Sequence, residues 1–339
     1  MSNRRIACWM SEKKICKINW VEFGKTSLQH DFRLFKLDLN KSLESQGPFC
    51  VLLHKLTDII ASADQGDPKC ASLIKKVEEY IAAHPSVIVL DPIPNVRQLL
   101  NRYISYRKIN STNLHKHGIF IPNFCELKST NVVELSHQLK NAGVTYPFIC
   151  KPSLGHGKQA HEMSIVFNER GLVDCKMPCV AQSFINHNAV LYKIFIVGDK
   201  HHCVERPSLK NFQAGQDQTI HFDSGDVSKA GSRNSLTVLE PHERVDRVEP
   251  DSEVLKRIAG TLREAFGMDL LGVDVVIENR TGRYAIIDVN AFPGYDGFPD
   301  FFDTLLQCIN NKVNAKYDSK LDRLGDKYFD DISLEKIDS

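Results

Sequence analysis

The sequence predicts an α/β protein of more than one domain, and three observations lead to this prediction. The first 90 residues alternate short apolar segments with polar or amphipathic ones, which is typical of a small sheet covered by helices. From residue 146 onwards, strand-like segments are separated by Gly and Pro turns, which favours an antiparallel sheet with helices on one side. The length of 339 residues is sufficient for two or three domains.

The N-terminal part is predicted to contain four strands and an amphipathic helix. Leu73, Val77, Tyr80 and Ile81 recur at helical spacing between the third and fourth strands. The Asp-Pro-Ile-Pro sequence at 91–94 interrupts the alternation and marks a boundary. The four expected strands are Ile6–Met10, Phe32–Leu37, Phe49–Leu53 and Val87–Leu90.

The rest of the chain is predicted to add further strands and two helices. A helix is expected at 253–266, where five apolar residues share one face and Gly267 follows as a stop signal. These five are Leu255, Ile258, Ala259, Leu262 and Phe266. A last helix is expected at 301–313, and the polar segment 319–339 is expected to be a poorly packed tail. The expected strands before the first of these helices are 146–151, 162–167, 179–185, 189–197 and 201–205.

The composition narrows the class of protein. A hydrophobic content of 42% with 25% charged residues is typical of a soluble globular protein. No apolar run approaches the roughly 20 residues of a membrane helix, and the N-terminus is no signal peptide. The ten cysteines form no C-x-x-C pair, so we expect reduced thiols and no structural zinc. A net charge of +1 argues against a nucleic-acid surface. We therefore expect a cytoplasmic monomer with neither a membrane nor a nucleic acid as partner.

Two local clusters of positive charge stand out in this nearly neutral chain. Residues 1–20 hold five bases against one acid, and residues 96–117 hold five bases and no acid. Such clusters fit a small polyanion better than a long one. For most of these residues individually, a solvated helix face is the commoner explanation.

The stretch 270–294 predicts a hairpin that binds a metal. Asp274 is the only charge in one apolar segment, while Asp288 and Asn290 lie two residues apart in the next and therefore share a face. The turn residues at 278–282 would bring Asp274 beside Asp288. Mg²⁺ uses one or two carboxylates together with substrate phosphates and water, so the motif implies phosphates as well as metal. The alternative is a structural ion pair on a buried hairpin.

Lys151 ends an apolar strand and precedes a loop that contains Gly155 and Gly157. Such a loop can bring backbone N–H groups close to phosphate oxygens. It is no Walker A loop, and its match to G-x-G-x-x-A through Ala160 is rejected because a strand, not a helix, is expected to follow. An ordinary hairpin loop is the alternative.

Further cations and hydroxyls follow other expected strands. Lys193 lies in an apolar alternation, where it needs an anion unless it faces solvent. Lys14 and Lys55 follow the first and third strands, where an alternating sheet commonly presents its ligand-binding loops. The segment 206–210 adds two more cations and a hydroxyl, and the polar stretch 223–229 is either a lid or an exposed loop.

This order of motifs resembles the ATP-grasp superfamily. Within it, six segments resemble the inositol 1,3,4-trisphosphate 5/6-kinase family, also called the inositol-tetrakisphosphate 1-kinases, and the resemblance covers residues 6 to about 313. The segments are Ser-Glu-Lys-Lys at 11–14, His-Lys-Leu-Thr-Asp at 54–58, His-Gly at 156–157, Asn-His-Asn-Ala-Val-Leu-Tyr-Lys at 186–193, Arg-Pro-Ser-Leu-Lys-Asn at 206–211 and Asn-Ala-Phe-Pro-Gly at 290–294.

The resemblance implies the ATP-grasp fold in three domains. They are an N-terminal Rossmann-like αβ domain at 1–95, a central ATP-grasp domain at 96–185 and a C-terminal ATP-grasp domain at 186–318 with the metal site, each ATP-grasp domain built on an antiparallel sheet. The polar tail at 319–339 follows.

The resemblance also implies an ATP-dependent kinase that transfers the γ-phosphoryl group to a ring hydroxyl of an inositol polyphosphate, with two Mg²⁺ ions. An ATP-grasp ligase that activates a carboxylate and a non-catalytic nucleotide-binding regulator are the alternatives. Lys14, Lys55 and His161 favour a polyanionic acceptor over the ligase.

Carried over position by position, the resemblance assigns roles to particular residues. Lys151, Lys193 and His161 would be catalytic, and Asp274, Asp288 and Asn290 would hold magnesium. ATP would contact Arg102, Lys151, Gln182, Ser183, Phe184, Ile185, Lys193, Ser208, Ser224 and Ser228. Within this set, the stretch 182–193 would line the nucleotide, and the last three serines would touch the phosphates or their surroundings. The inositol phosphate would contact Lys14, Lys55, His161, Lys193, Asn290 and Gly294. The sequence departs from the family pattern in the loop after Lys151 and in 212–250, and it carries Asp288 where most ATP-grasp enzymes carry Glu.

Overall fold

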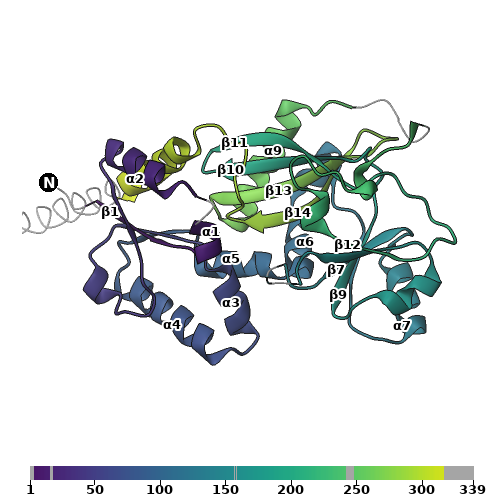
Figure 1. Cartoon of the computed structure of the whole chain (residues 1–339), viewed down its shortest axis with the longest axis horizontal. Helices are drawn as coiled ribbons and strands as arrows, with labels where there is room; N and C mark the ends of the chain where they lie inside the picture. Colours follow the sequence, from purple (N-terminus) through teal and green to yellow (C-terminus); the bar gives the residue numbers. More distant parts are fainter. Residues whose placement is uncertain (1–3, 16–17, 156, 158, 242–247, 317–339) are drawn as a thin grey trace, which may run out of the picture. The chain divides into compact units, whose positions relative to one another are not determined.

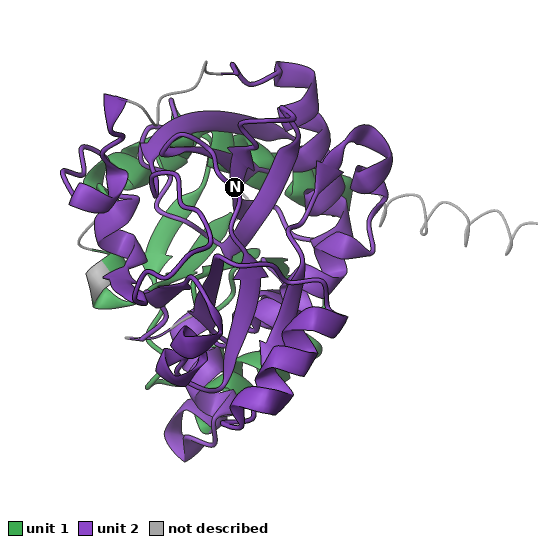
Figure 2. Cartoon of the chain, turned by 90° about the vertical axis from the view of Figure 1, so that its right-hand side faces the viewer, with its two compact units in different colours: residues 1–56, 72–90, 300–339 green, residues 57–71, 91–299 purple. Residues whose placement is uncertain are grey.

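The computed structural model describes residues 4–15, 18–155, 157, 159–241 and 248–316 (Figure 1). The chain divides into two compact units (Figure 2). Unit 1 comprises residues 1–56, 72–90 and 300–339, and unit 2 comprises residues 57–71 and 91–299. The predicted tail at 319–339 lies outside the described residues, and the three-domain boundaries stay a prediction.

Unit 1 is built on a parallel sheet of four strands in the order β2-β1-β3-β4. Each strand lies within two residues of the segment expected from the sequence. The central strands β1 and β3 are almost wholly buried, because their continuous apolar runs face helices or core on both sides. The four strands are β1 Arg5–Trp9, β2 Arg33–Lys36, β3 Val51–His54 and β4 Ile88–Leu90.

The helices of unit 1 pack their apolar faces on this sheet and on one another. In α4 (Pro68–Ala83), which begins in unit 2, Ile74, Val77 and Tyr80 are buried at the spacing expected for a helix. Phe23 of α2 (Trp20–Gln29) stacks on Phe302 at a centroid distance of 4.9 Å, so the helical stretch 301–316 returns to unit 1. The short elements of this unit are α1 Glu12–Ile15 and η1 Glu44–Gln46.

Unit 2 contains a central antiparallel sheet in the order β12-β8-β7-β9-β6. One face is covered by α7 (Val132–Asn141), which buries Leu135 and Leu139 against Phe148 and Val166. The side chain of Asn131 caps this helix. The strands are β6 Phe124–Leu127, β7 Phe148–Pro152, β8 Glu162–Val166, β9 Cys179–Ser183 and β12 Ile220–Asp223.

A second sheet of unit 2 has the order β11-β10-β13-β14-β5 and is antiparallel except for the β14–β5 pair. Helix α9 (Ser252–Phe266) packs against it, with the five predicted apolar residues buried. It ends at Gly267, whose φ of 59° is the left-handed conformation expected of a helix stop. The strands are β5 Ile119–Phe120, β10 Val190–Val197, β11 Lys200–Pro207, β13 Leu270–Ile277 and β14 Tyr284–Ala291.

The remaining helices of unit 2 lie in the connections between strands. Asn101 lies between α5 and α6 and caps α6 by accepting a hydrogen bond from the Ile104 amide at 3.1 Å. No helix in the described part of the chain is both long and apolar enough to cross a bilayer. The connecting helices are α3 Thr57–Asp64, α5 Ile93–Leu100, α6 Arg102–Asn110, η2 Asn113–His117, η3 Glu169–Asp174, α8 Ser224–Val227 and η4 Ser235–Thr237.

Candidate functional site

The hairpin of β13 and β14 brings the three predicted metal ligands together. Asp274 and Asp288 lie directly opposite each other in the antiparallel register, and Asn290 lies opposite Gly272 one step further along the same face. This pairing is the one that the sequence predicted. Two carboxylates in opposite positions repel each other, so the arrangement calls for cations nearby.

Lys193 extends this row of charges to a third strand. It lies opposite Asp274 on β10, and its Nζ is 2.7 Å from Asp274 Oδ1. The side chains are 22% and 15% exposed, so the lysine does not simply face solvent. The three strands therefore present Lys193, Asp274 and Asp288 side by side on one face of the sheet.

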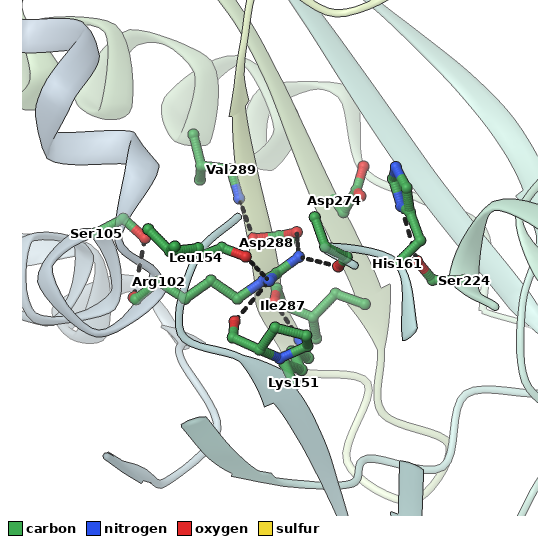
Figure 3. A network of polar contacts seen from close by, with 12 residues as sticks. Arg102, Ser105, Lys151, Leu154, His161, Ser224, Asp274, Ile287, Asp288 and Val289 are labelled. Carbon is green, nitrogen blue, oxygen red and sulfur yellow. Dashed lines mark hydrogen bonds and ion pairs between the residues drawn. The ribbon is translucent and has the colours of Figure 1, made fainter. Parts of the chain in front are cut away.

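A β-bulge interrupts the hairpin next to Asp288. Asp274 pairs with Asp288 but Val275 pairs with Ile286, so Ile287 lies outside the ladder. The Ile287 carbonyl instead accepts hydrogen bonds from Lys151 Nζ at 2.8 Å and from the Tyr106 hydroxyl at 2.9 Å. The bulge thus links β14 to β7 and α6 within unit 2 (Figure 3).

Lys151 is 5% exposed and uses all three of its donors inside the protein. Besides Ile287, its Nζ donates to the Tyr106 hydroxyl at 3.0 Å and to Gln182 Oε1 at 2.7 Å. Burial lowers the pKa of Lys151 to about 8, and the nearby Asp288 carboxylate opposes this shift. Gln182 Nε2 is buried without a hydrogen-bond partner among the described residues, so a polar group of a ligand would satisfy it.

Arg102 shapes the loop that follows Lys151. It is 4% exposed, and its guanidinium donates to the carbonyl oxygens of Pro152, Leu154 and Ala160 at 2.7, 3.1 and 3.1 Å. Its Nη2 also lies 3.9 Å from Asp288 Oδ2, so the loop and the carboxylate share one cation (Figure 3). The predicted contact of Arg102 with ATP stays a prediction.

His161 and Ser224, which come from separate segments, lie together. His161 Nδ1 is 3.2 Å from Ser224 Oγ, and the Ser224 amide donates to the His161 carbonyl at 2.9 Å (Figure 3). The Ser228 amide in turn donates to the Ser224 carbonyl at 3.0 Å. The structure therefore places His161 beside Ser224 at the start of α8, with Ser228 at the end of the same short helix.

The predicted nucleotide-lining segment 182–185 forms the end of β9 and the chain beyond it. The Phe184 amide donates to the Pro147 carbonyl at 3.0 Å, and the Thr145 amide donates to Ser183 Oγ at 3.0 Å. The Ile185 carbonyl faces the ring of His187, which contacts Ser208 on its other side. The resemblance had placed His187 only within the nucleotide-lining stretch 182–193, and the sequence assigned no role to Tyr106, which contacts Lys151.

The remaining predicted substrate contacts occupy two places. Lys14 lies in α1 after β1, and Lys55 directly follows β3. Because β1 and β3 are neighbouring parallel strands, both lysines follow the same edge of the unit 1 sheet. In unit 2, Gly294 is exposed in the loop after β14. A Cβ at Gly272 would lie 2.9 Å from Pro293 Cγ, so only glycine there lets this loop cross the sheet face.

The oxygen donors of the hairpin fit a hard cation whose remaining coordination positions are filled by a bound ligand. Two carboxylates and one amide oxygen converge on one face, and oxygen atoms are the donors that Mg²⁺ prefers. Within the described residues, no group of three or more His, Cys, Asp or Glu side chains is placed to hold a metal. Nucleotide phosphates would have to supply the remaining oxygens.

Two family models match the chain. Residues 5–96 match the inositol 1,3,4-trisphosphate 5/6-kinase pre-ATP-grasp domain, and residues 113–311 match the inositol 1,3,4-trisphosphate 5/6-kinase ATP-grasp domain. Among similar proteins, an inositol-tetrakisphosphate 1-kinase of Danio rerio is 44% identical over 93% of this chain and 81% of its own length. One of Xenopus laevis is 45% identical over 91% of this chain and 79% of its own length.

Solved structures with low sequence identity share the fold. D-cycloserine synthetase DcsG has a TM-score of 0.59 at 12% identity and covers 91% of this chain and 99% of its own. The D-alanine–D-alanine ligase of Bacillus anthracis has a TM-score of 0.53 at 14% identity, covering 94% of this chain and 100% of its own. The ATP-grasp fold predicted from the sequence is confirmed. At sequence identities of 12% and 14%, the structural similarity shows only that the fold is shared.

Proposed function

The chain belongs to the inositol 1,3,4-trisphosphate 5/6-kinase family, and we propose that it transfers the γ-phosphoryl group of ATP to a ring hydroxyl of an inositol polyphosphate. The row of Lys193, Asp274 and Asp288 on one sheet face carries this proposal. Phosphoryl transfer depends mainly on positioning and on charge neutralisation. The row provides both without a protein nucleophile.

Asp274, Asp288 and Asn290 would hold Mg²⁺, which we propose to be two ions. Bound Mg²⁺ would neutralise negative charge on the nucleotide phosphates. It would also relieve the repulsion between the two opposed carboxylates, which in the protein alone is countered by Lys193 on one side and Arg102 on the other.

The lysines and His161 take complementary roles in the proposed reaction. Lys151 would bind a nucleotide phosphate by exchanging one of its three protein acceptors for a phosphate oxygen. Lys193 would neutralise negative charge at the reacting centre, and its hydrogen bond would keep Asp274 oriented. His161, next to Ser224, would contact a phosphate of the inositol. No covalent enzyme intermediate is needed.

The acceptor distinguishes this proposal from an ATP-grasp ligase. Both enzymes would share the nucleotide and metal residues, but a ligase needs no cluster of cations for its carboxylate substrate. Lys14 and Lys55 at one sheet edge of unit 1 suit a polyanion. We also propose a monomer in a reducing, cytoplasmic compartment, which the nine free cysteines of the described residues support.

The test is a transfer assay with labelled ATP, Mg²⁺ and a panel of inositol phosphates. Label is expected in at least one inositol phosphate, and label in none of them would refute the kinase. Asp288→Ala should abolish transfer, whereas Asp199→Ala, in the exposed turn between β10 and β11, should retain it. Near-normal turnover of the Asp288 variant would show that the metal site is misplaced. Lys14→Met and Lys55→Met should raise KM for the inositol phosphate and leave KM for ATP unchanged.

A further inference from the structure

His187 connects the predicted nucleotide-lining segment to Ser208. Its Nδ1 is 2.5 Å from the Ile185 carbonyl oxygen, and its Nε2 is 2.7 Å from Ser208 Oγ. Both side chains are buried, at 5% and 6% exposure. The Ser208 backbone is fixed as well, because its amide donates to the Ala189 carbonyl at 2.8 Å. The imidazole therefore bridges the predicted nucleotide-lining segment and the residue that follows β11.

The partners of His187 determine its tautomer. A carbonyl oxygen can only accept a hydrogen bond, so Nδ1 must carry the proton that it shares with Ile185. Burial lowers the pKa of His187 to about 4, so the ring is neutral near neutral pH and Nε2 holds a lone pair. Nε2 must then accept, which means that the Ser208 hydroxyl donates its proton to the ring.

This bond leaves Ser208 with lone pairs only. A serine hydroxyl has one proton and two acceptor lone pairs, and the proton is committed to His187. A phosphate oxygen offers no proton near neutral pH, so it makes a poor partner for a hydroxyl in this state. An amine or a hydroxyl of a ligand would be a good one.

We propose that His187 is a positioning residue that fixes Ser208 as an acceptor, so that Ser208 recognises a hydrogen-bond donor on the nucleotide and not a phosphate. The inference rests on the proposed function, because it takes Ser208 to line the nucleotide site. Two groups of ATP have the required chemistry, namely the exocyclic amine of adenine and the ribose hydroxyls. The sequence resemblance, by contrast, placed Ser208 with the phosphates or their surroundings.

The test compares the binding of four nucleotides to the full chain by calorimetry with Mg²⁺. The probes are ATP, purine riboside triphosphate, 2′-deoxy-ATP and 3′-deoxy-ATP, each analogue lacking one donor. The wild type is expected to bind one analogue about 10- to 100-fold more weakly than ATP. The analogue identifies the group that Ser208 recognises. Ser208→Ala should bind that analogue and ATP with similar affinity.

Two substitutions of His187 test its hydrogen bonds to Ile185 and to Ser208 separately. The Asn side chain places its amide near the position of Nδ1, so His187→Asn keeps the Ile185 contact and should lose the discrimination. The Gln side chain reaches the position of Nε2, so its amide oxygen should accept the Ser208 hydroxyl proton. His187→Gln should therefore retain the discrimination between nucleotides. A purely structural role would affect both variants and all nucleotides alike. Thermal unfolding checks that each variant is folded. If the Asn variant fails to fold, the two single variants Ser208→Ala and His187→Gln are sufficient to test the inference.

Three outcomes would overturn the inference. Ser208→Ala could discriminate as strongly as the wild type, or the wild type could bind all four nucleotides equally. Ser208→Ala could also weaken the binding of inorganic tripolyphosphate and of all four nucleotides by one common factor, which is the result expected of a phosphate contact. Each of these leaves the proposed kinase standing if label still reaches an inositol phosphate. A wild type that binds no nucleotide would refute the kinase and the inference together.

Discussion

Lys151 Nζ lies 2.8 Å from the carbonyl oxygen of Ile287, the residue that the β-bulge leaves outside the ladder next to Asp288. One strand therefore carries a proposed metal ligand and an acceptor for the proposed phosphate-binding lysine at adjacent positions. A phosphate oxygen must displace at least one of the three protein acceptors of Lys151. The position of the lysine thus depends on the groups around Ile287, above all on Tyr106.

Tyr106→Phe should weaken both the fold and nucleotide binding. The Tyr106 hydroxyl accepts from Lys151 and donates to Ile287, and the residue is fully buried. Its removal leaves a lysine proton and part of a carbonyl unsatisfied, so the free energy of unfolding should fall by about 1–3 kcal/mol. Urea unfolding measures this loss, and KM for ATP should rise because Lys151 is no longer held in place.

Tyr103→Phe is the matched control for this change. Tyr103 lies on the same helix and also packs edge-on against Phe124, but it is only half-buried. Its substitution should change the free energy of unfolding by less than about 0.5 kcal/mol and leave KM for ATP as it is. Equal effects of the two substitutions would show that the Tyr106 hydroxyl does not position Lys151.

Asp288→Asn should abolish transfer and should not stabilise the metal-free protein. The amide oxygen can still accept the Val289 N–H, which Asp288 Oδ1 accepts at 3.1 Å, and the repulsion with Asp274 is removed. The change also removes the negative charge beside the buried cations Arg102 and Lys151. In EDTA the melting temperature should therefore be equal to or lower than that of the wild type.

Addition of Mg²⁺ with ADP distinguishes the two proteins. Binding to the folded state raises the melting temperature of the wild type, and this rise should be absent or strongly reduced in Asp288→Asn. Asp199→Asn, in the exposed turn of the same sheet, should show the full rise. An undiminished rise in the Asp288 variant would remove that carboxylate from the proposed metal site.

The sequence predicted a hairpin with Asp288 and Asn290 on one face, because the turn residues and the strand period of two are local information. The register that starts from the pair Ile277 and Tyr284 would by itself place Ile287 opposite Asp274, and the bulge brings Asp288 there instead. The bulge at Ile287 could not be predicted in the same way. Its carbonyl is satisfied by Tyr106 and Lys151, which are more than 130 positions away in the chain.

The side-chain contacts of individual residues show the same limit. Tyr106 appeared only within a basic stretch, although it is buried at the centre of the Lys151 network. Arg102 was expected at a ligand, yet three of its contacts are loop carbonyls. His187 was part of a resembling segment, and only the positions of Ile185 and Ser208 reveal its tautomer. Side-chain hydrogen bonds between distant segments leave no periodic signal in a sequence.

Asp91→Asn tests whether the start of β13 needs its buried anchor. The carboxylate of Asp91 accepts the backbone N–H groups of Asp269 at 2.8 Å and of Leu270 at 3.0 Å. The amide can serve only one of them and places its own N–H groups near the other. Urea unfolding should show a loss of about 1–3 kcal/mol, while KM for ATP stays constant. A variant as stable as the wild type would show that these bonds contribute nothing.

His187 should make the protein sensitive to acid. Burial lowers its pKa from 6.5 to about 4, so the unfolded chain takes up the proton first as the pH falls. The stability associated with the neutral ring is fully present above pH 6.5 and is lost between pH 6.5 and about 4. At about pH 5 this loss is roughly 2 kcal/mol relative to neutral pH. Urea unfolding at both pH values should therefore show a larger loss for the wild type than for His187→Gln, which has no titrating group there. Equal losses would mean that the imidazole is not held neutral between Ile185 and Ser208.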